Sequence, residues 1–147
     1  MISLPKNLGQ LKVKARQAFY SDNYTVMADA LNEAWKLALE LEKDEISARI
    51  AHVASDLFNR AEMDDRALDF AYAAVKHKRA AGTRDIFLAN YLGFLSKRLL
   101  EMGNPKEALP YANTCVEIYV ELYGEEYHET QFQIQWWYKI LLETEKS

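Results

Sequence analysis

The three histidines, His52, His77 and His128, have the chemistry to bind a metal or to move a proton. His52 precedes Asp56 by one helical turn, so both side chains could reach one ion, but no third or fourth ligand follows at a suitable spacing. His128 is followed by Glu129, yet the second histidine of a helical H-E-x-x-H zinc site is missing. A polar position in a groove is therefore favoured over a ligand, and the sequence predicts no metal site.

The single cysteine, Cys115, cannot form an internal disulfide. It occupies a regularly spaced small-residue position, so packing is favoured over nucleophilic chemistry. The sequence has no Gly-rich phosphate loop, no G-x-S-x-G motif and no Cys/His pairing. We therefore predict that the protein is not an enzyme, has no catalytic residues and needs no cofactor.

Aromatic side chains are concentrated in the C-terminal third of the chain. Trp136 and Trp137 are adjacent, so on a helix they point about 100° apart and are not expected to face the same core. An exposed tryptophan is a typical anchor of protein interfaces, whereas packing of the last helix on the preceding repeat is the alternative. The residues of this candidate interface are Tyr123, Tyr127, Trp136 and Trp137.

Length and composition indicate a single domain over residues 1–147 that is rich in helix-forming residues. The net charge of −4 argues against a nucleic-acid partner, which would favour a basic protein. No run approaches the roughly 18 apolar residues of a membrane span, and residues 1–6 lack the apolar run of a signal peptide. We expect a cytoplasmic protein with neither nucleic-acid nor membrane partners.

Apolar residues recur every three or four positions almost throughout the chain, which is the helical period. The clearest break, Gly103-Asn104-Pro105, combines a left-handed helix end, an N-cap and a proline at a first helical position. Gly82 is likewise predicted to end a helix in the left-handed conformation, and Thr83 to cap the start of the next helix. Pro110 is expected to bend its helix rather than to end it. Seven helices are predicted, near residues 6–20, 23–43, 45–61, 64–80, 84–102, 105–123 and 129–145.

A spacing of about forty residues relates these helices to one another. In the second helix of each pair, mostly small side chains occupy one position in the first turn and the positions four and seven residues after it. Small side chains at these positions let the two helices approach closely. These positions are Ala108, Ala112 and Cys115 in the last unit, Ala67, Ala71 and Ala74 in the middle unit, and Met27, Leu31 and Ala34 in the first.

This pattern resembles the tetratricopeptide repeat (TPR), a hairpin of two antiparallel helices. The last unit, with Gly103, residues 107–110 (EALP) and residues 124–130, is similar to the longer repeat of about 42 residues found in kinesin light chains. Glu129 stands where that variant has proline. The resemblance implies an all-α, right-handed superhelix of three hairpins closed by a capping helix. The repeats would span residues 8–44, 45–83 and 84–128, and the cap residues 129–145.

In such a stack the first helices line a concave face, on which the resemblance places peptide ligands. The offsets that packing does not use bring cations and amides to this face, although the protein as a whole is acidic. Fixed cations suit an acidic or carboxylate-bearing peptide, and solvated positions without a ligand are the alternative. The predicted groove residues are Lys12, Arg16, Arg49, His52, Asn59, Asn90 and Lys97.

We therefore predict a non-enzymatic adaptor that binds a segment of another protein, of acidic character, in this groove. The alternative is a self-associating scaffold or regulatory subunit that forms a homodimer through its aromatic C-terminal residues. The clamp with which some TPR domains hold the C-terminal carboxylate of chaperones is not predicted, because only Lys12 matches its set of positions.

Overall fold

The computed structural model describes residues 4–146, which form seven α-helices and no strand. Met1–Ser3, on which the expectation of no signal peptide partly rests, lie outside the described residues, as does Ser147. The chain divides into two compact units, Met1–Ala81 and Gly82–Ser147. Within residues 4–146, no helix is both long enough and apolar enough to cross a membrane.

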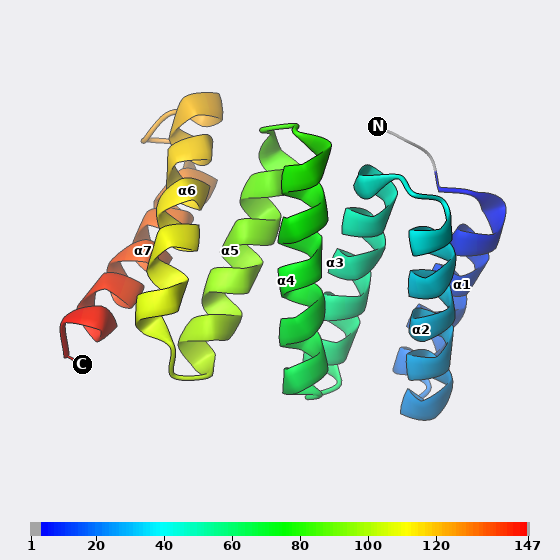
Figure 1. Cartoon of the computed structure of the whole chain (residues 1–147). Coiled ribbons are helices and arrows are strands. Elements are labelled where there is room, and N and C mark those ends of the chain that lie inside the picture. The colour runs from blue at the N-terminus through cyan, green and yellow to red at the C-terminus, as the bar shows by residue number, and fades with distance from the viewer. Residues whose placement is uncertain (1–3, 147) are drawn as a thin grey trace. The chain divides into compact units, whose positions relative to one another are not determined.

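The first unit contains α1 (Lys6–Tyr20), α2 (Tyr24–Glu40), α3 (Asp44–Arg60) and α4 (Asp64–Ala81), joined by short turns (Figure 1). Consecutive helices pack against each other, and α1 also contacts α3. Small alanines on the facing sides let the helices approach closely, and larger side chains fill the remaining space. The buried residues of the main cluster are Ala15, Ala18, Met27, Ala30, Leu31, Ala54, Leu57, Phe58 and Ala67.

A histidine–carboxylate hydrogen bond and an ion pair join the last turns of α4 to the first turn of α3. His77 Nδ1 lies 2.8 Å from Asp44 Oδ1, and Lys78 Nζ contacts Glu45 Oε1. Lys78 is only 1% exposed, whereas the Glu45 side chain is 33% exposed, so the ammonium group is the buried member of the pair. Because a buried charge is stable only with a partner, Glu45 and Lys78 hold the α3/α4 hairpin in one alignment.

The second unit contains α5 (Ile86–Glu101), α6 (Pro105–Tyr123) and α7 (His128–Lys146). Helix α6 packs against both α5 and α7, and α7 makes a smaller contact with α5. Periodic apolar side chains on all three helices form the interior, as the helical pattern predicts. Its buried residues include Leu92, Leu95, Leu99, Ala108, Ala112, Cys115, Ile118 and Ile140.

The three hairpin turns have the same backbone conformation. Asp22, Glu62 and Gly103 all adopt a left-handed conformation, with φ of 57°, 60° and 81°. In each turn the N–H of the following residue donates to a carbonyl five residues earlier, at 2.8 to 2.9 Å. This hydrogen bond is typical of a Schellman helix end. The predicted repeat of about forty residues is therefore present in the backbone as well as in the side-chain pattern.

Two predicted helix boundaries were wrong. Helix α2 ends at Glu40 rather than at residue 43, because Glu42 turns left-handed with φ of 53°. Helix α5 begins at Ile86 rather than at residue 84, because Asp85 and not Thr83 caps it. The Asp85 carboxylate accepts a hydrogen bond of 3.0 Å from the N–H of Leu88. Helix α6 continues past Pro110, as expected for a proline that does not end a helix.

Candidate functional site

Three predicted groove residues lie close together on α1 and α3 of the first unit. Helix α1 buries Leu8, Ala15 and Ala18, which leaves Lys12 and Arg16 on an adjoining side of the helix. The pKa of Lys12 is lowered by burial first, and then by the positive charges of Arg16 and Arg49. Both arginines are therefore near enough to Lys12 to repel its charge, and we call the three residues the basic cluster.

The basic cluster is not neutralised on its α1 side. Among residues 4–146, neither Lys12 nor Arg16 forms an ion pair with a carboxylate. The nearby carboxylate of Asp56 is instead paired with Arg60 on the same helix, at 3.2 Å. The cluster thus presents a concentration of positive charge on a protein whose net charge is −4.

His52 and Asn59 continue along α3 from Arg49 at helical spacing, and both are half-buried. Burial lowers the pKa of His52, and the charge of Asp56 opposes this shift only in part. The imidazole is therefore mainly neutral at pH 7, so it can donate one hydrogen bond and accept another. No three His, Cys, Asp or Glu side chains come together as a metal site within the described part of the chain.

In the second unit, Asn90 has a structural contact that the sequence did not predict. Its Oδ1 accepts a hydrogen bond of 2.6 Å from the hydroxyl of Tyr119, so Asn90 ties α5 to α6. Burial is the largest of several causes that raise the pKa of Tyr119 to about 12, so this hydroxyl keeps its proton. The recurring apolar spacing of α6 could have indicated that Tyr119 faces α5.

Lys97, the last predicted groove residue, lies against aromatic rings of α7. Its Nζ is 5.0 Å from the centre of the Phe132 ring and 5.3 Å from that of the Trp136 ring. Lys139 also places its Nζ 5.0 Å from the Trp136 ring. Burial lowers the pKa of Lys97. We call Lys97, Phe132, Trp136 and Lys139 the Lys–Trp cluster.

The two adjacent tryptophans point in different directions. Trp136 lies beside Lys97 of α5, whereas Trp137 donates its Nε1–H to Asn113 Oδ1 of α6, at 2.5 Å. Both side chains are half-buried. Trp137 thus packs the last helix onto α6, and Trp136 is the ring that lies at a mixed, partly open surface.

Tyr123 and Tyr127, the other predicted interface residues, pair with each other. Their ring centres are 4.9 Å apart, and the two side chains are 46% and 43% exposed. Within residues 4–146 neither ring contacts Trp136 or Trp137. The four predicted interface residues therefore do not form one continuous aromatic face.

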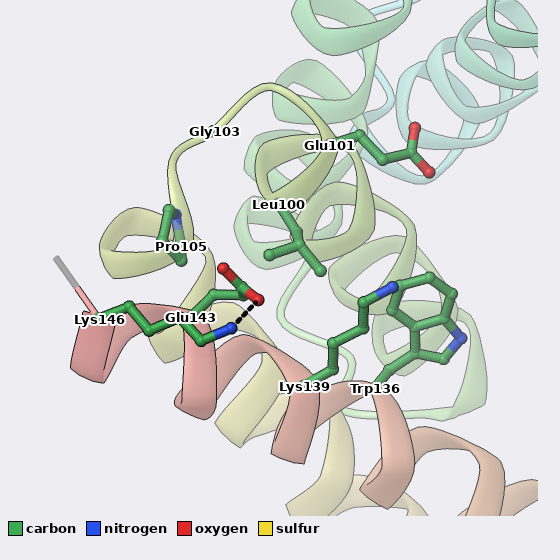
Figure 2. A pocket seen from close by; sticks show the side chains of 8 residues that line it. All are labelled: Leu100, Glu101, Gly103, Pro105, Trp136, Lys139, Glu143 and Lys146. Carbon is green, nitrogen blue, oxygen red and sulfur yellow. Dashed lines mark hydrogen bonds and ion pairs between the residues drawn. The ribbon is translucent and has the colours of Figure 1, made fainter.

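A groove of about 520 Å³ lies next to Trp136, and Figure 2 shows the side chains around it. Its carboxylates have local partners, since Glu143 pairs with Lys146 at 3.1 Å and Glu101 with Arg98 at 2.8 Å. The sequence did not predict this groove, because it is built from the end of one helix, a turn and a helix later in the chain. The lining residues are Leu100, Glu101, Gly103, Pro105, Trp136, Lys139, Glu143 and Lys146.

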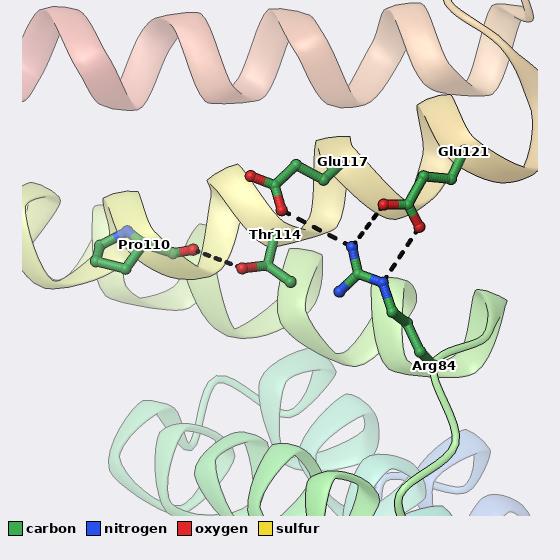
Figure 3. A network of polar contacts seen from close by, with 5 residues as sticks. All are labelled: Arg84, Pro110, Thr114, Glu117 and Glu121. Atoms are coloured by element: carbon green, nitrogen blue, oxygen red, sulfur yellow. Dashed lines mark hydrogen bonds and ion pairs between the residues drawn. The ribbon is translucent and has the colours of Figure 1, made fainter.

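A two-pronged ion pair fixes the start of the α5/α6 hairpin that carries Lys97 (Figure 3). Arg84 donates from Nε and from its terminal amino group to the two oxygens of Glu121, at 3.2 and 2.9 Å. Glu117 lies 3.8 Å from the same guanidinium. The hydrogen bonds from Arg84 lower the pKa of Glu121, which keeps this exposed pair charged down to acidic pH.

No protein-family model matches this sequence, and no curated protein matches it significantly. Fold and site define the class of protein: an all-helical protein of repeat-like hairpins with similar left-handed turns, carrying clustered cations on each unit.

Proposed function

We propose that the chain is a TPR-like, non-enzymatic interaction module of the cytoplasm that binds an acidic segment of another protein. The basic cluster on α1 and α3 would hold that segment. The observation that carries this proposal is the close approach of Lys12, Arg16 and Arg49 in a protein of net charge −4. Within residues 4–146, Lys12 and Arg16 form no ion pair with a carboxylate, and a bound carboxylate would supply one.

The expected binding energy comes from relief of this repulsion and from charge-assisted hydrogen bonds. A hydrogen bond to a charged group contributes about 1.5–3 kcal/mol, whereas an exposed ion pair contributes about 0.2–1 kcal/mol. Lys12 is half-buried, so its contact with the bound carboxylate should resemble the stronger, charge-assisted hydrogen bond. Arg16 is exposed, so its contact should resemble the weaker, exposed ion pair. Binding should weaken as salt is added, because screening acts on the exposed charges.

A labelled hexaglutamate peptide tests this proposal directly. We expect it to bind the protein at low salt, and we expect the double variant Arg16→Glu with Arg49→Glu to bind about tenfold more weakly or worse. The matched control is Lys14→Glu with Lys36→Glu, which makes the same change of net charge at exposed positions on α1 and α2. Fluorescence anisotropy gives the affinity, and far-UV circular dichroism checks that each variant folds. Equal loss in both double variants, or no binding by the unaltered protein, would contradict the proposal.

Self-association is a second candidate, favoured by exposed apolar groups at the C-terminal end of α6. Leu122 is 48% exposed and stands next to the Tyr123–Tyr127 pair. Burial of such groups against a second copy would remove apolar surface from water. Sedimentation analysis should then show a dimer that Tyr123→Ser with Tyr127→Ser converts to monomer. A monomer at all accessible concentrations would exclude this candidate.

A further inference from the structure

Two ammonium groups of the second unit share one aromatic ring. Lys97 of α5 and Lys139 of α7 lie 5.3 and 5.0 Å from the centre of the Trp136 ring. Within residues 4–146, neither lysine forms an ion pair with a carboxylate, although Lys146 and Arg98 in the same region both do. The Lys–Trp cluster is therefore a local excess of positive charge.

The position of Lys97 makes this excess unfavourable in the protein alone. Removing an ammonium group from water costs free energy, so burial lowers the pKa of Lys97, and the charge of Glu129 offsets this shift only in part. A cation over an aromatic face recovers only about 0.5–2 kcal/mol. An anion placed beside Lys97 and Lys139 would remove most of the remaining cost, because both donors are already held near one place.

The groove beside Lys139 and Trp136 is apolar in part. Leu100, Gly103 and Pro105 line the groove of about 520 Å³ next to Trp136 (Figure 2). Gly103 contributes no side chain, which leaves space above the turn. A free inorganic anion would leave this surface uncovered, whereas a segment that carries an aliphatic side chain next to a carboxylate would use both features.

We propose that the groove of the second unit binds an acidic–aliphatic segment of a partner protein. Its carboxylates would lie at Lys97 and Lys139, and a neighbouring aliphatic side chain would cover Leu100, Pro105 and the Trp136 ring. This site goes beyond the binding proposed for the basic cluster, because it uses other residues in the other unit and also selects an apolar group.

The three indole N–H signals of the protein in ¹H–¹⁵N spectra provide the measurement, and Trp136→Phe identifies the one at the site. The probes are the blocked peptides Glu-Leu-Glu, Gln-Leu-Gln and Glu-Ser-Glu. We expect Glu-Leu-Glu to shift the Trp136 signal at concentrations about tenfold lower than the other two peptides. The response should persist in the Arg16→Glu, Arg49→Glu variant, which separates this site from the basic cluster.

Lys139→Met should weaken Glu-Leu-Glu binding about tenfold, and Lys97→Met should do the same if it folds. The matched control is Lys36→Met, which removes an exposed ammonium group of α2 outside the groove and should change binding less than about twofold. Equal binding of Glu-Leu-Glu and Gln-Leu-Gln, no effect of Lys139→Met, or tighter binding of inorganic phosphate would each overturn the proposal.

Discussion

Glu62, in the turn between α3 and α4, stands in a conformation that glycine adopts more easily, and its replacement by glycine should stabilise the protein. Its φ is 60°, and its side chain is exposed. A residue with a Cβ loses about 1–2 kcal/mol in the left-handed region. Glycine avoids this loss but gives up about 0.5–1 kcal/mol of conformational entropy on folding. The net expectation for Glu62→Gly is a gain of about 0.5–1 kcal/mol in the free energy of unfolding.

Gly103 provides the opposite change at the equivalent position of the last hairpin. A Cβ on Gly103 would have no heavy atom within 4 Å, so only backbone strain at φ of 81° opposes alanine. Gly103→Ala should therefore destabilise the protein by about 0.5–1 kcal/mol. Asp22→Gly should gain less than Glu62→Gly, because aspartate tolerates the left-handed conformation better than most residues.

Urea unfolding followed by far-UV circular dichroism measures these differences. The slope of the free energy against urea should not change, because the substitutions leave the buried surface unaltered. A lower stability for Glu62→Gly, or no effect of Gly103→Ala, would show that the turn conformation does not limit stability in the way we describe.

Three further predictions concern the interior of the two units. Phe58 is 0% exposed and stacks on Phe70 at 5.7 Å, so Phe58→Ala should lower the free energy of unfolding by about 3–5 kcal/mol in urea titrations. Burial raises the pKa of Cys115 to about 12, so the folded protein keeps a proton that the unfolded chain releases near pH 9. Stability should therefore fall between about pH 9 and 12, by up to about 1.4 kcal/mol per pH unit, and less steeply in Cys115→Ala. A Cβ on Gly93 would lie 3.1 Å from Cys115 Sγ and 3.3 Å from Gln133 Oε1, so Gly93→Ala should destabilise the protein, and urea titrations should show a smaller loss once Cys115 is alanine.

Local sequence signals predicted most of the helices and two of the special turn positions. Gly82 and Gly103 end their helices in the left-handed conformation that glycine favours, as expected. Asp22 and Glu62 adopt the same conformation without glycine, and only the recurring hairpin geometry explains this. Thr83 was a plausible cap by type, but the backbone brings Asp85 to the capping position instead.

The apolar period of three and four residues by itself indicated that this chain is all-helical. The spacing of about forty residues by itself indicated that the hairpins repeat, because both features depend only on positions along the sequence. The neighbours of each exposed polar side chain were decided only by the tertiary structure. Lys97 was predicted as a groove cation and Trp136 as an interface anchor, and the packing of α7 on α6, next to α5, joined them in one cluster. Asn90 was predicted to meet a ligand, but the packing of α5 on α6 makes its Oδ1 the acceptor of a hydrogen bond from the Tyr119 hydroxyl. Contacts between helices depend on how far each helix is rotated about its own axis, and that rotation is set by the whole buried surface rather than by any local spacing.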